Sequence, residues 1–195
     1  MSSKQKVRYG DYLILSSAEL SSTQYVAARS MAEATAKVIT ENRDIAPHMK
    51  DISLSLYPNT QELVFQILPR MEYQAYNEIK KMKEDDPRYH IIKRRLVAET
   101  QLNLDERKKM HQKVVSFGDV IQLYHGLTNS YLRFSDNKTA VKNTYKVALS
   151  KESFDETHFK VLPGVSLKKE GQPLSFFDKL SLNCVSNTMT LSTME

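Results

Sequence analysis

Residues 115–135 of the chain read VSFGDVIQLYHGLTNSYLRFS, and this stretch decides how the rest of the sequence is interpreted. It opens on the motif Val-x-aromatic-Gly-Asp, continues through an apolar segment at 120–123, and reaches a polar turn at 126–130. Glycine accepts positive φ and aspartate bonds its own backbone, so Gly118-Asp119 suits a tight turn. The stretch therefore predicts a Gly-Asp turn followed by two paired strands.

The same phrases recur elsewhere in the chain. Residues 7–11, VRYGD, match residues 115–119, VSFGD, at each defining position, and a third opening at 177–182, FDKLSL, has lost the glycine. A closing phrase also recurs, as FQILP at 65–69 and FKVLP at 159–163. Proline suits a strand end because it cannot donate to the ladder. The sequence thus predicts a threefold β repeat whose third unit shows no closing phrase up to residue 195.

The repeats set the expected organisation of a single domain over residues 1–195. The first repeat covers 7–69, the second 114–163, and an incomplete third 176–195. Residues 70–113 break the β pattern and are expected to project from the barrel as a helical arm between repeats 1 and 2.

Local patterns give finer expectations for individual elements. Helices are expected at about 71–83 and 88–112, on either side of an acidic breaker that ends in a proline. Asn103 or Asp105 is expected to interrupt the second helix. Strands are expected near 36–40, where a helix over 27–43 is the alternative, and at 141–149 by alternation. By composition, 164–175 is expected to be a loop.

Composition and charge narrow the function classes. The chain is 41% hydrophobic and carries a net charge of +5, from 28 basic and 23 acidic residues. The segment 70–113 holds twelve of the basic and eight of the acidic residues, so most of the net charge lies there. Cys184 is the one cysteine, which excludes an internal disulfide. The first residues are not an export signal, and no window reaches the roughly 20 apolar residues of a membrane helix.

The expected arm is the main candidate for a functional surface. Its apolar positions exceed what a freestanding hairpin can bury, and an exposed apolar patch tends to mark an interface. The alternative is that this stripe packs back on the barrel. Interleaved acids disfavour nucleic acid, and a narrow apolar stripe disfavours a membrane surface. The expected partner interface comprises Tyr76, Ile79, Lys80, Met82, Arg88, Ile91, Ile92, Arg95, Leu96, Val165 and Leu167.

No pattern of catalytic or metal-binding residues is visible. The five histidines are scattered without metal-ligand spacing, and His125 is expected to be a solvated residue of a loop. The recurring Asp11, Asp119 and Asp178 are interpreted as turn formers, because repeat symmetry would hold them far apart. The sequence therefore predicts a protein that is not an enzyme and that uses no cofactor and no metal.

The order of these motifs resembles a known family. Three Gly-Asp hairpins with a helical hairpin after the first resemble the N-terminal β-trefoil of the inositol 1,4,5-trisphosphate receptor and ryanodine receptor superfamily. Residues 114–132 also resemble the MIR motif shared with protein O-mannosyltransferases. The join LVFQILPRMEYQA at 63–75, with Asn103 and the basic residues 107–109, favours the inositol trisphosphate receptor branch. The resemblance implies a mainly β fold, a β-trefoil with an inserted helical hairpin arm.

The resemblance also implies a role. In this family the first trefoil is a suppressor domain, which modulates inositol trisphosphate binding and gating of a tetrameric calcium-release channel through neighbouring domains and subunits. The expected location is the cytoplasmic face of the endoplasmic reticulum membrane. Where the family has an aromatic residue in a partner-contacting loop, the loop at 164–173 carries only Val165 and Leu167 as large apolar residues.

Two alternatives stay open at this point. In the first, the chain binds an inositol phosphate directly, and the arm together with Lys168 and Lys169 of the loop supplies the cations. In the second, the chain is an MIR-type module of another protein.

Overall fold

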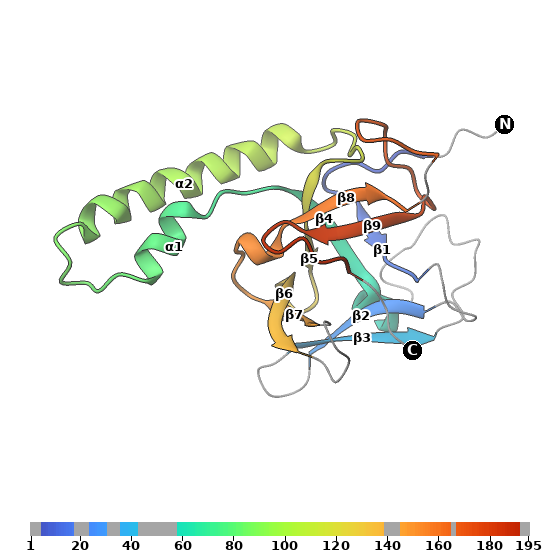
Figure 1. Ribbon diagram of the computed structural model, residues 1–195, viewed down its shortest axis with the longest axis horizontal. Coiled ribbons are helices and arrows are strands. Elements are labelled where there is room, and N and C mark those ends of the chain that lie inside the picture. Colours follow the sequence, from blue (N-terminus) through green and yellow to red (C-terminus); the bar gives the residue numbers. More distant parts are fainter. Residues whose placement is uncertain are drawn as a thin grey trace.

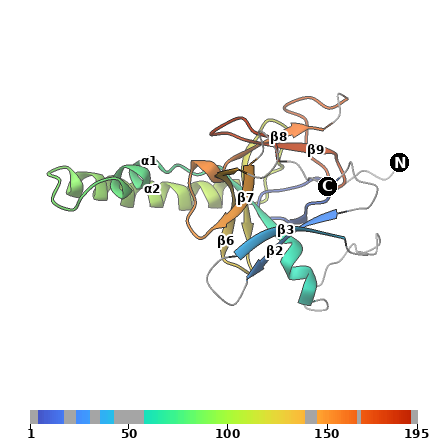
Figure 2. The same ribbon diagram turned by 60° about the horizontal axis from the view of Figure 1, so that its bottom comes forward.

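The computed structural model describes a mainly β core from which a helical arm projects on one side (Figure 1). A view turned by 60° shows the same projection, so the arm extends away from the core and does not lie across it (Figure 2). The described residues are 5–17, 24–30, 36–42, 58–138, 145–164 and 167–191.

The elements follow in chain order. The strands are β1 (Tyr12–Ile14), β2 (Gln24–Ser30), β3 (Ala36–Asn42), β4 (Val64–Pro69), β5 (Val120–His125), β6 (Ser130–Lys138), β7 (Tyr145–Ser150), β8 (Phe159–Pro163) and β9 (Leu180–Cys184). The helices are α1 (Gln74–Lys80) and α2 (Tyr89–Met110), with short 3-10 helices η1 (Pro58–Leu63) and η2 (Asp155–Thr157).

The two closing phrases form strands β4 and β8, and each of these strands joins neighbouring repeats. Strand β4 pairs antiparallel with β1 of its own repeat and with β5 of the next, whereas β8 pairs with β5 and then with β9. The same backbone hydrogen bond recurs at both places. Ile67 receives a bond from Gly10 (2.8 Å) and Val161 receives one from Gly118 (2.7 Å), each through its carbonyl oxygen. The closing strand therefore links successive repeats.

Three openings meet in a closed ring of backbone hydrogen bonds. The N–H of Val7 donates to the carbonyl of Leu174 (2.9 Å), that of Leu174 to Val115 (2.8 Å), and that of Val115 back to Val7 (2.9 Å). A closed ring of three equivalent bonds places the openings around a common axis. The fold is thus a β-trefoil with a helical insert, as the sequence predicted.

Each opening contains the expected aspartate turn. The carboxylates of Asp11, Asp119 and Asp178 each accept a hydrogen bond from the backbone N–H three residues earlier, at 2.8, 2.9 and 2.9 Å. These bonds hold the chain in a tight turn before each first strand, so the interpretation of the three aspartates as turn formers is confirmed.

The ring corrects where the third opening starts. Leu174 occupies the place of Val7 and Val115, two residues before the expected start at 176, and the segment reads LSFFD. Pro173 and Ser175 form β-bridges to the other openings. The end of the expected 164–175 loop is therefore part of the β core.

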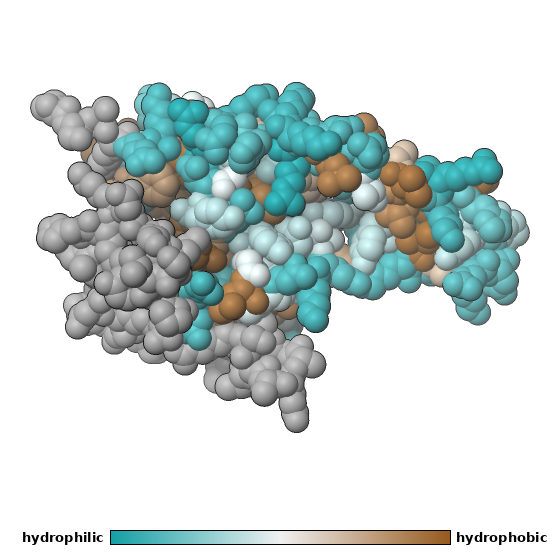
Figure 3. Space-filling model, turned by 180° about the vertical axis from the view of Figure 1, so that it is seen from behind, coloured by the Kyte–Doolittle hydropathy of each residue, from teal (hydrophilic) through white to brown (hydrophobic). Residues whose placement is uncertain are grey.

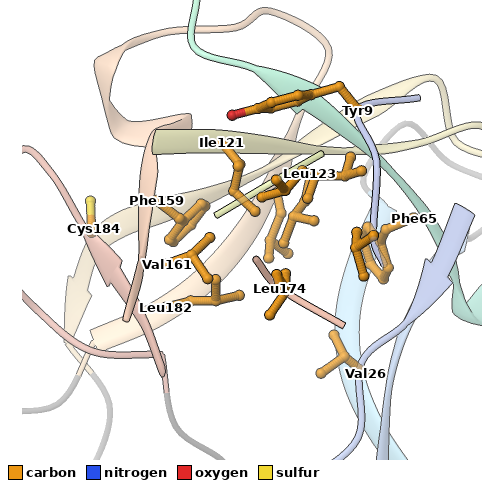
Figure 4. Packing of buried hydrophobic residues seen from close by; sticks show 14 of the residues in the cluster. Tyr9, Val26, Phe65, Ile121, Leu123, Phe159, Val161, Leu174, Leu182 and Cys184 are labelled. Carbon is orange, nitrogen blue, oxygen red and sulfur yellow. The ribbon is translucent and has the colours of Figure 1, made fainter. Parts of the chain in front are cut away.

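The apolar interior comes from all three repeats. Figure 4 shows Ile121, Leu123, Phe159, Val161 and Leu174 directed toward one another, with side chains from β5, β8 and the third opening. Each of these residues is at most 3% exposed. Burying one large apolar side chain contributes about 1.5–3 kcal/mol, so the core stabilises the three repeats jointly.

The secondary-structure expectations near 36–40 and 145–149 are confirmed by β3 and β7, and Ala27 lies in β2 instead of a helix. Val141 lies outside the described residues. Both helices of the arm are present with shorter bounds than expected. The expected interruption at Asn103 or Asp105 is wrong, because α2 continues through both positions.

The expectation for His125 is also wrong, because its side chain is fully buried. Its Nε2–H donates to the carbonyl oxygen of Gln61 (3.0 Å), while Nδ1 faces the hydroxyl of Thr128 (2.9 Å). The ring also lies 5.1 Å from that of Phe65. Burial lowers the pKa of His125, so the neutral imidazole joins η1 to the β5–β6 turn.

Candidate functional site

Side chains of α2 organise the start of α1. Helix α1 has no side-chain cap of its own at Tyr73, which leaves its first N–H groups without intrahelical partners. The carboxylate of Glu99 accepts bonds from the N–H groups of Ala75 (2.7 Å) and Tyr76 (3.2 Å). A negative group at a helix N-terminus is also favoured by the helix dipole. Glu99 therefore acts as the cap of a helix to which it does not belong.

Asn103 holds the chain just before α1. Its amide oxygen accepts from the N–H of Glu72 (2.9 Å), and its amide nitrogen donates to the carbonyl of Glu72 (2.8 Å). This pair of bonds occupies the side chain that was expected to interrupt α2. Asn103 and Glu99, one helical turn apart, thus fix α1 against α2.

The apolar candidates of the arm divide by exposure. Ile92 is 7% exposed, and Ile79, Met82 and Leu96 are partly buried. Ile91 is 62% exposed. The hairpin therefore covers most of the stripe from which the interface was inferred, and Ile91 is the large apolar member of that stripe that stays open to solvent.

Other apolar residues of α2 are exposed that the sequence reasoning did not single out. Val97 is 67% exposed, Leu102 is 69% exposed and Leu104 is 48% exposed. The rear view shows apolar surface among hydrophilic residues on the arm (Figure 3). Val97 and Leu104 are seven residues apart and so share one side of α2, outside the stripe from which the interface was inferred. A search for apolar residues outside that stripe could have found them.

The charged candidates of the arm are all paired. Arg88 binds Asp86 (3.0 Å) and Arg95 binds Glu78 (3.0 Å), so both pairs lie inside the arm. Arg88 holds the pKa of the Asp86 carboxyl below its usual range through a hydrogen bond. Exposed ion pairs contribute about 0–1 kcal/mol each to folding stability, so these two pairs add little to the stability of the arm.

The segment between β7 and β8 attaches the arm to the core. Lys80 reaches from α1 to Glu152 (2.8 Å), and its Nζ lies 4.5 Å from the ring centroid of Phe154. The Tyr76 ring also lies 5.7 Å from that of Phe154. A bond from Asn77 to Asp155 (3.3 Å) adds a further contact. We call this segment, residues 152–158, the bracket.

A buried polar chain lies at the base of the arm, beneath the bracket. The hydroxyl of Tyr73 donates to the Gln122 side chain (3.0 Å), whose amide in turn donates to the hydroxyl of Thr157. Burial raises the pKa of Tyr73 to about 12. Buried polar groups are costly unless they are paired. These hydrogen bonds therefore fix one geometry for the join between arm and core.

His158 completes the join. Its ring stacks on that of Tyr73 with 5.5 Å between centroids and 22° between planes. Burial lowers the pKa of His158 to about 4, against the opposing charge of Asp155. Neutral His158 and Tyr73 therefore form an uncharged aromatic contact between the bracket and the arm. No local sequence pattern pointed to this contact, because the two residues are far apart in the chain.

The loop candidates behave differently from the arm. Leu167 is 89% exposed, and Val165 lies outside the described residues. Lys168 is bound to Asp178 (2.9 Å), and its Nζ also lies 5.6 Å from the Phe117 ring centroid. Lys169 is exposed. The structure thus does not bring Lys168 and the arm cations together as one cationic site.

The fold and the arm define the class of this protein. No described helix combines the length and the apolar composition that crossing a bilayer requires. The chain is a mainly β domain, a β-trefoil core whose helical arm is joined to it by the bracket. The family model described as inositol 1,4,5-trisphosphate/ryanodine receptor matches residues 2–195, so the chain belongs to this family of receptor and channel domains. The resemblance inferred from the repeats is thereby confirmed.

Proposed function

We propose that this chain is a regulatory domain of an intracellular ligand-gated calcium-release channel, which modulates inositol trisphosphate binding and gating without catalysing a reaction. Its partners are neighbouring domains and subunits of the same tetrameric channel. The proposed location is the cytoplasmic face of the endoplasmic reticulum membrane. Family membership supports a receptor domain, and the arm supports the regulatory role.

The observation that carries the proposal is that the arm exposes apolar side chains on α2 while its base is attached to the core. Exposed apolar side chains on α2, at Val97 and Leu104, are seven residues apart and so lie on one side of the helix, where they offer a surface for a protein partner. The bracket and the Tyr73 contact fix the base of the same arm to the core. A partner that binds the arm therefore acts on the trefoil through a defined join.

The alternative of direct ligand binding requires free cations in a shared pocket. Lys168 is paired with Asp178, and Lys160 is paired with Glu170 (2.9 Å), so two of the cations near the loop are already neutralised. An inositol phosphate would have to displace these carboxylates. The regulatory role is therefore the better-supported proposal.

Calorimetry with purified protein tests the choice between these roles. The chain titrated with inositol 1,4,5-trisphosphate is expected to give no binding heat at micromolar concentrations. Binding at micromolar or tighter affinity that is abolished by Lys168→Glu and Lys169→Glu would establish the alternative.

A second experiment tests the arm in a receptor fragment that also contains the ligand-binding domains. The fragment with this domain is expected to bind inositol trisphosphate more weakly than the fragment without it. Val97→Glu and Leu104→Glu are expected to recover part of the lost affinity, because they place charge in the proposed contact. Lys138→Glu, an exposed change on the core, is the matched control. An affinity that the arm variants leave unchanged would refute a role for this surface.

A further inference from the structure

The side of α2 that carries Val97 and Leu104 has a charge pattern of its own. On a helix, side chains three and four positions apart are neighbours on the surface. Each such neighbour of these two residues is exposed and is either basic or an uncharged polar residue. The neighbours are Lys93, Arg94, Thr100, Gln101, Arg107 and Lys108. We call Val97, Leu104 and these six neighbours the basic face.

The acidic residues of α2 lie outside the basic face. Leu102 is 69% exposed, and its surface neighbours include Glu99, Asp105 and Glu106. Glu99 accepts the first N–H groups of α1, and Glu106 pairs with Lys109 (3.1 Å). Acidic and basic residues that alternate along the sequence are therefore separated in space, on different sides of the helix.

The cations of the basic face keep most of their charge unpaired. Within the part of the chain that the structure describes, Lys93, Arg94 and Arg107 form no ion pair with a carboxylate. Lys108 reaches Asp105 only at 3.9 Å. The basic face therefore combines two exposed apolar side chains with a border of positive charge that the chain itself does not neutralise.

The spacing of the two apolar residues favours a helix as the partner. Val97 and Leu104 are seven residues apart, which is about 10.5 Å along the axis. Helices that pack along one another bring an apolar residue to the contact once in every seven residues, and the charged residues beside that contact select the partner. The arm projects away from the core, so a second helix has room to lie along it (Figure 2).

We propose that the basic face of α2 binds an acidic amphipathic α-helix of a protein partner. Apolar side chains of that helix cover Val97 and Leu104. Its carboxylates meet Lys93 and Arg94 at one end and Lys108 at the other, over about 22 Å. The inference rests on the proposed function, because it gives the chemistry of the partner that the arm contacts.

Two other anionic partners fit the basic face less well. A helix that lies on a membrane needs a broad apolar face, whereas Val97 and Leu104 form a single narrow line. Single-stranded nucleic acid is held by aromatic side chains that stack on the bases, and the basic face contains no aromatic residue. The apolar pair at its centre would also have no counterpart in a phosphate backbone.

Two designed helical peptides are the probes for this inference. The acidic peptide carries leucines seven residues apart, with glutamates three and four positions from each leucine, and the basic peptide has lysine in place of each glutamate. Fluorescence anisotropy of the labelled peptides, titrated with the whole chain, measures binding. The acidic peptide is expected to bind saturably at micromolar concentrations, and the basic peptide about tenfold more weakly or less. Added salt is expected to weaken binding of the acidic peptide.

Variants of α2 locate the binding face. Val97→Glu is expected to weaken binding of the acidic peptide about tenfold, because it removes an apolar contact and adds a negative charge. Leu102→Glu is the matched control, since Leu102 and Val97 are 69% and 67% exposed. Arg94→Glu is expected to weaken binding by a similar factor, and Lys109→Glu makes the same charge change outside the basic face. All four positions are exposed, and far-UV circular dichroism checks that each variant keeps its helix.

The peptide experiment and the receptor-fragment experiment fail separately. Selective binding of the acidic peptide, in a domain that leaves the affinity for inositol trisphosphate unchanged, would refute the proposed function and support the partner chemistry. A domain that lowers this affinity but does not distinguish the two peptides would keep the proposed function and refute the acidic partner.

Four results would overturn the inference. The first is equal affinity for the acidic and basic peptides. The second is an equal loss of binding in Val97→Glu and Leu102→Glu. The third is tighter binding of phosphatidylserine-containing vesicles or of polyuridine RNA that Val97→Glu and Arg94→Glu abolish, which would assign the basic face to that ligand. The fourth is a dimer of the chain that the acidic peptide dissociates, which would assign the face to a second copy.

Discussion

The trefoil ring and the helical arm are stabilised in different ways. In the ring, backbone bonds among Val7, Val115 and Leu174 close on themselves, and the core beneath them comes from all three repeats. In the arm, α1 is positioned by single side chains, chiefly Glu99 and Asn103. A cooperative core and an insert held by single side chains can therefore lose stability separately.

The largest expected effect is on the free energy of unfolding, when the same leucine-to-alanine truncation is made in the core and in the arm. Leu123→Ala, at a fully buried position, is expected to cost about 2–5 kcal/mol of unfolding free energy, because it leaves a cavity in the shared core. Leu96→Ala, at a partly buried arm position, is expected to cost clearly less. Denaturant unfolding measures both values. Equal losses would show that arm and core form one cooperative unit.

The join between the two regions is expected to depend on pH. The pKa of His158 falls from 6.5 to about 4 on folding, so the unfolded chain binds the proton more readily in this window. Stability is therefore fully present above pH 6.5 and falls as the pH drops toward 4, by up to about 3 kcal/mol. Unfolding free energies at intermediate pH values measure the slope.

His158→Phe provides the control for that slope, because it keeps a ring against Tyr73 and removes the titrating group. His125, whose pKa is also lowered by burial, is present in both chains and cancels in the difference. Parallel pH curves for the two chains would contradict the placement of His158 at a buried join.

Loss of the Glu99 cap is expected to affect the arm alone. Glu99→Ala removes the acceptor for two N–H groups of α1, at an expected cost of about 1–2 kcal/mol. Amide exchange in α1 should accelerate while exchange in β5 and β8 stays unchanged. Asp105→Ala, an exposed carboxylate on the same helix, is the matched control. Faster exchange throughout the core would refute the separation of the two regions.

The smallest expected effect lies inside the ring and has the opposite sign. Phe177 holds φ at 67° where the first two openings have Gly10 and Gly118, and its side chain is 91% exposed. Phe177→Gly is expected to stabilise the chain by about 1 kcal/mol, since a non-glycine residue is strained in this conformation. The melting temperature measures the gain. Gly10→Ala is the control of opposite sign, because its Cβ would lie 2.6 Å from Nδ1 of His111.

The sequence was informative where a local pattern determines the structure. The Gly-Asp turns, the closing strands and the two helices follow from spacing and turn chemistry that are visible within a few residues. The third opening was placed late because Phe177 stands where the motif has glycine, although the remaining pattern of LSFFD fits.

The errors came from long-range contacts. His125 looked like a residue of a polar turn, but its ring is buried and binds a carbonyl oxygen 64 residues away in the chain. Asn103 has a low helix propensity, but its bonds to Glu72 hold it in α2. The contact of Tyr73 with His158 has no local signature. Such contacts depend on which distant residue the fold brings near, which propensity does not encode.

Site-resolved hydrogen exchange under native conditions tests the central claim most directly. The amides of Val7, Val115 and Leu174 are expected to exchange together, at the free energy of global unfolding, because their bonds form one closed ring. The amides of α1 are expected to exchange at a distinctly lower free energy. Three separate opening energies within the ring, or an arm that is protected as strongly as the ring, would contradict a cooperative trefoil that carries a separately fastened arm.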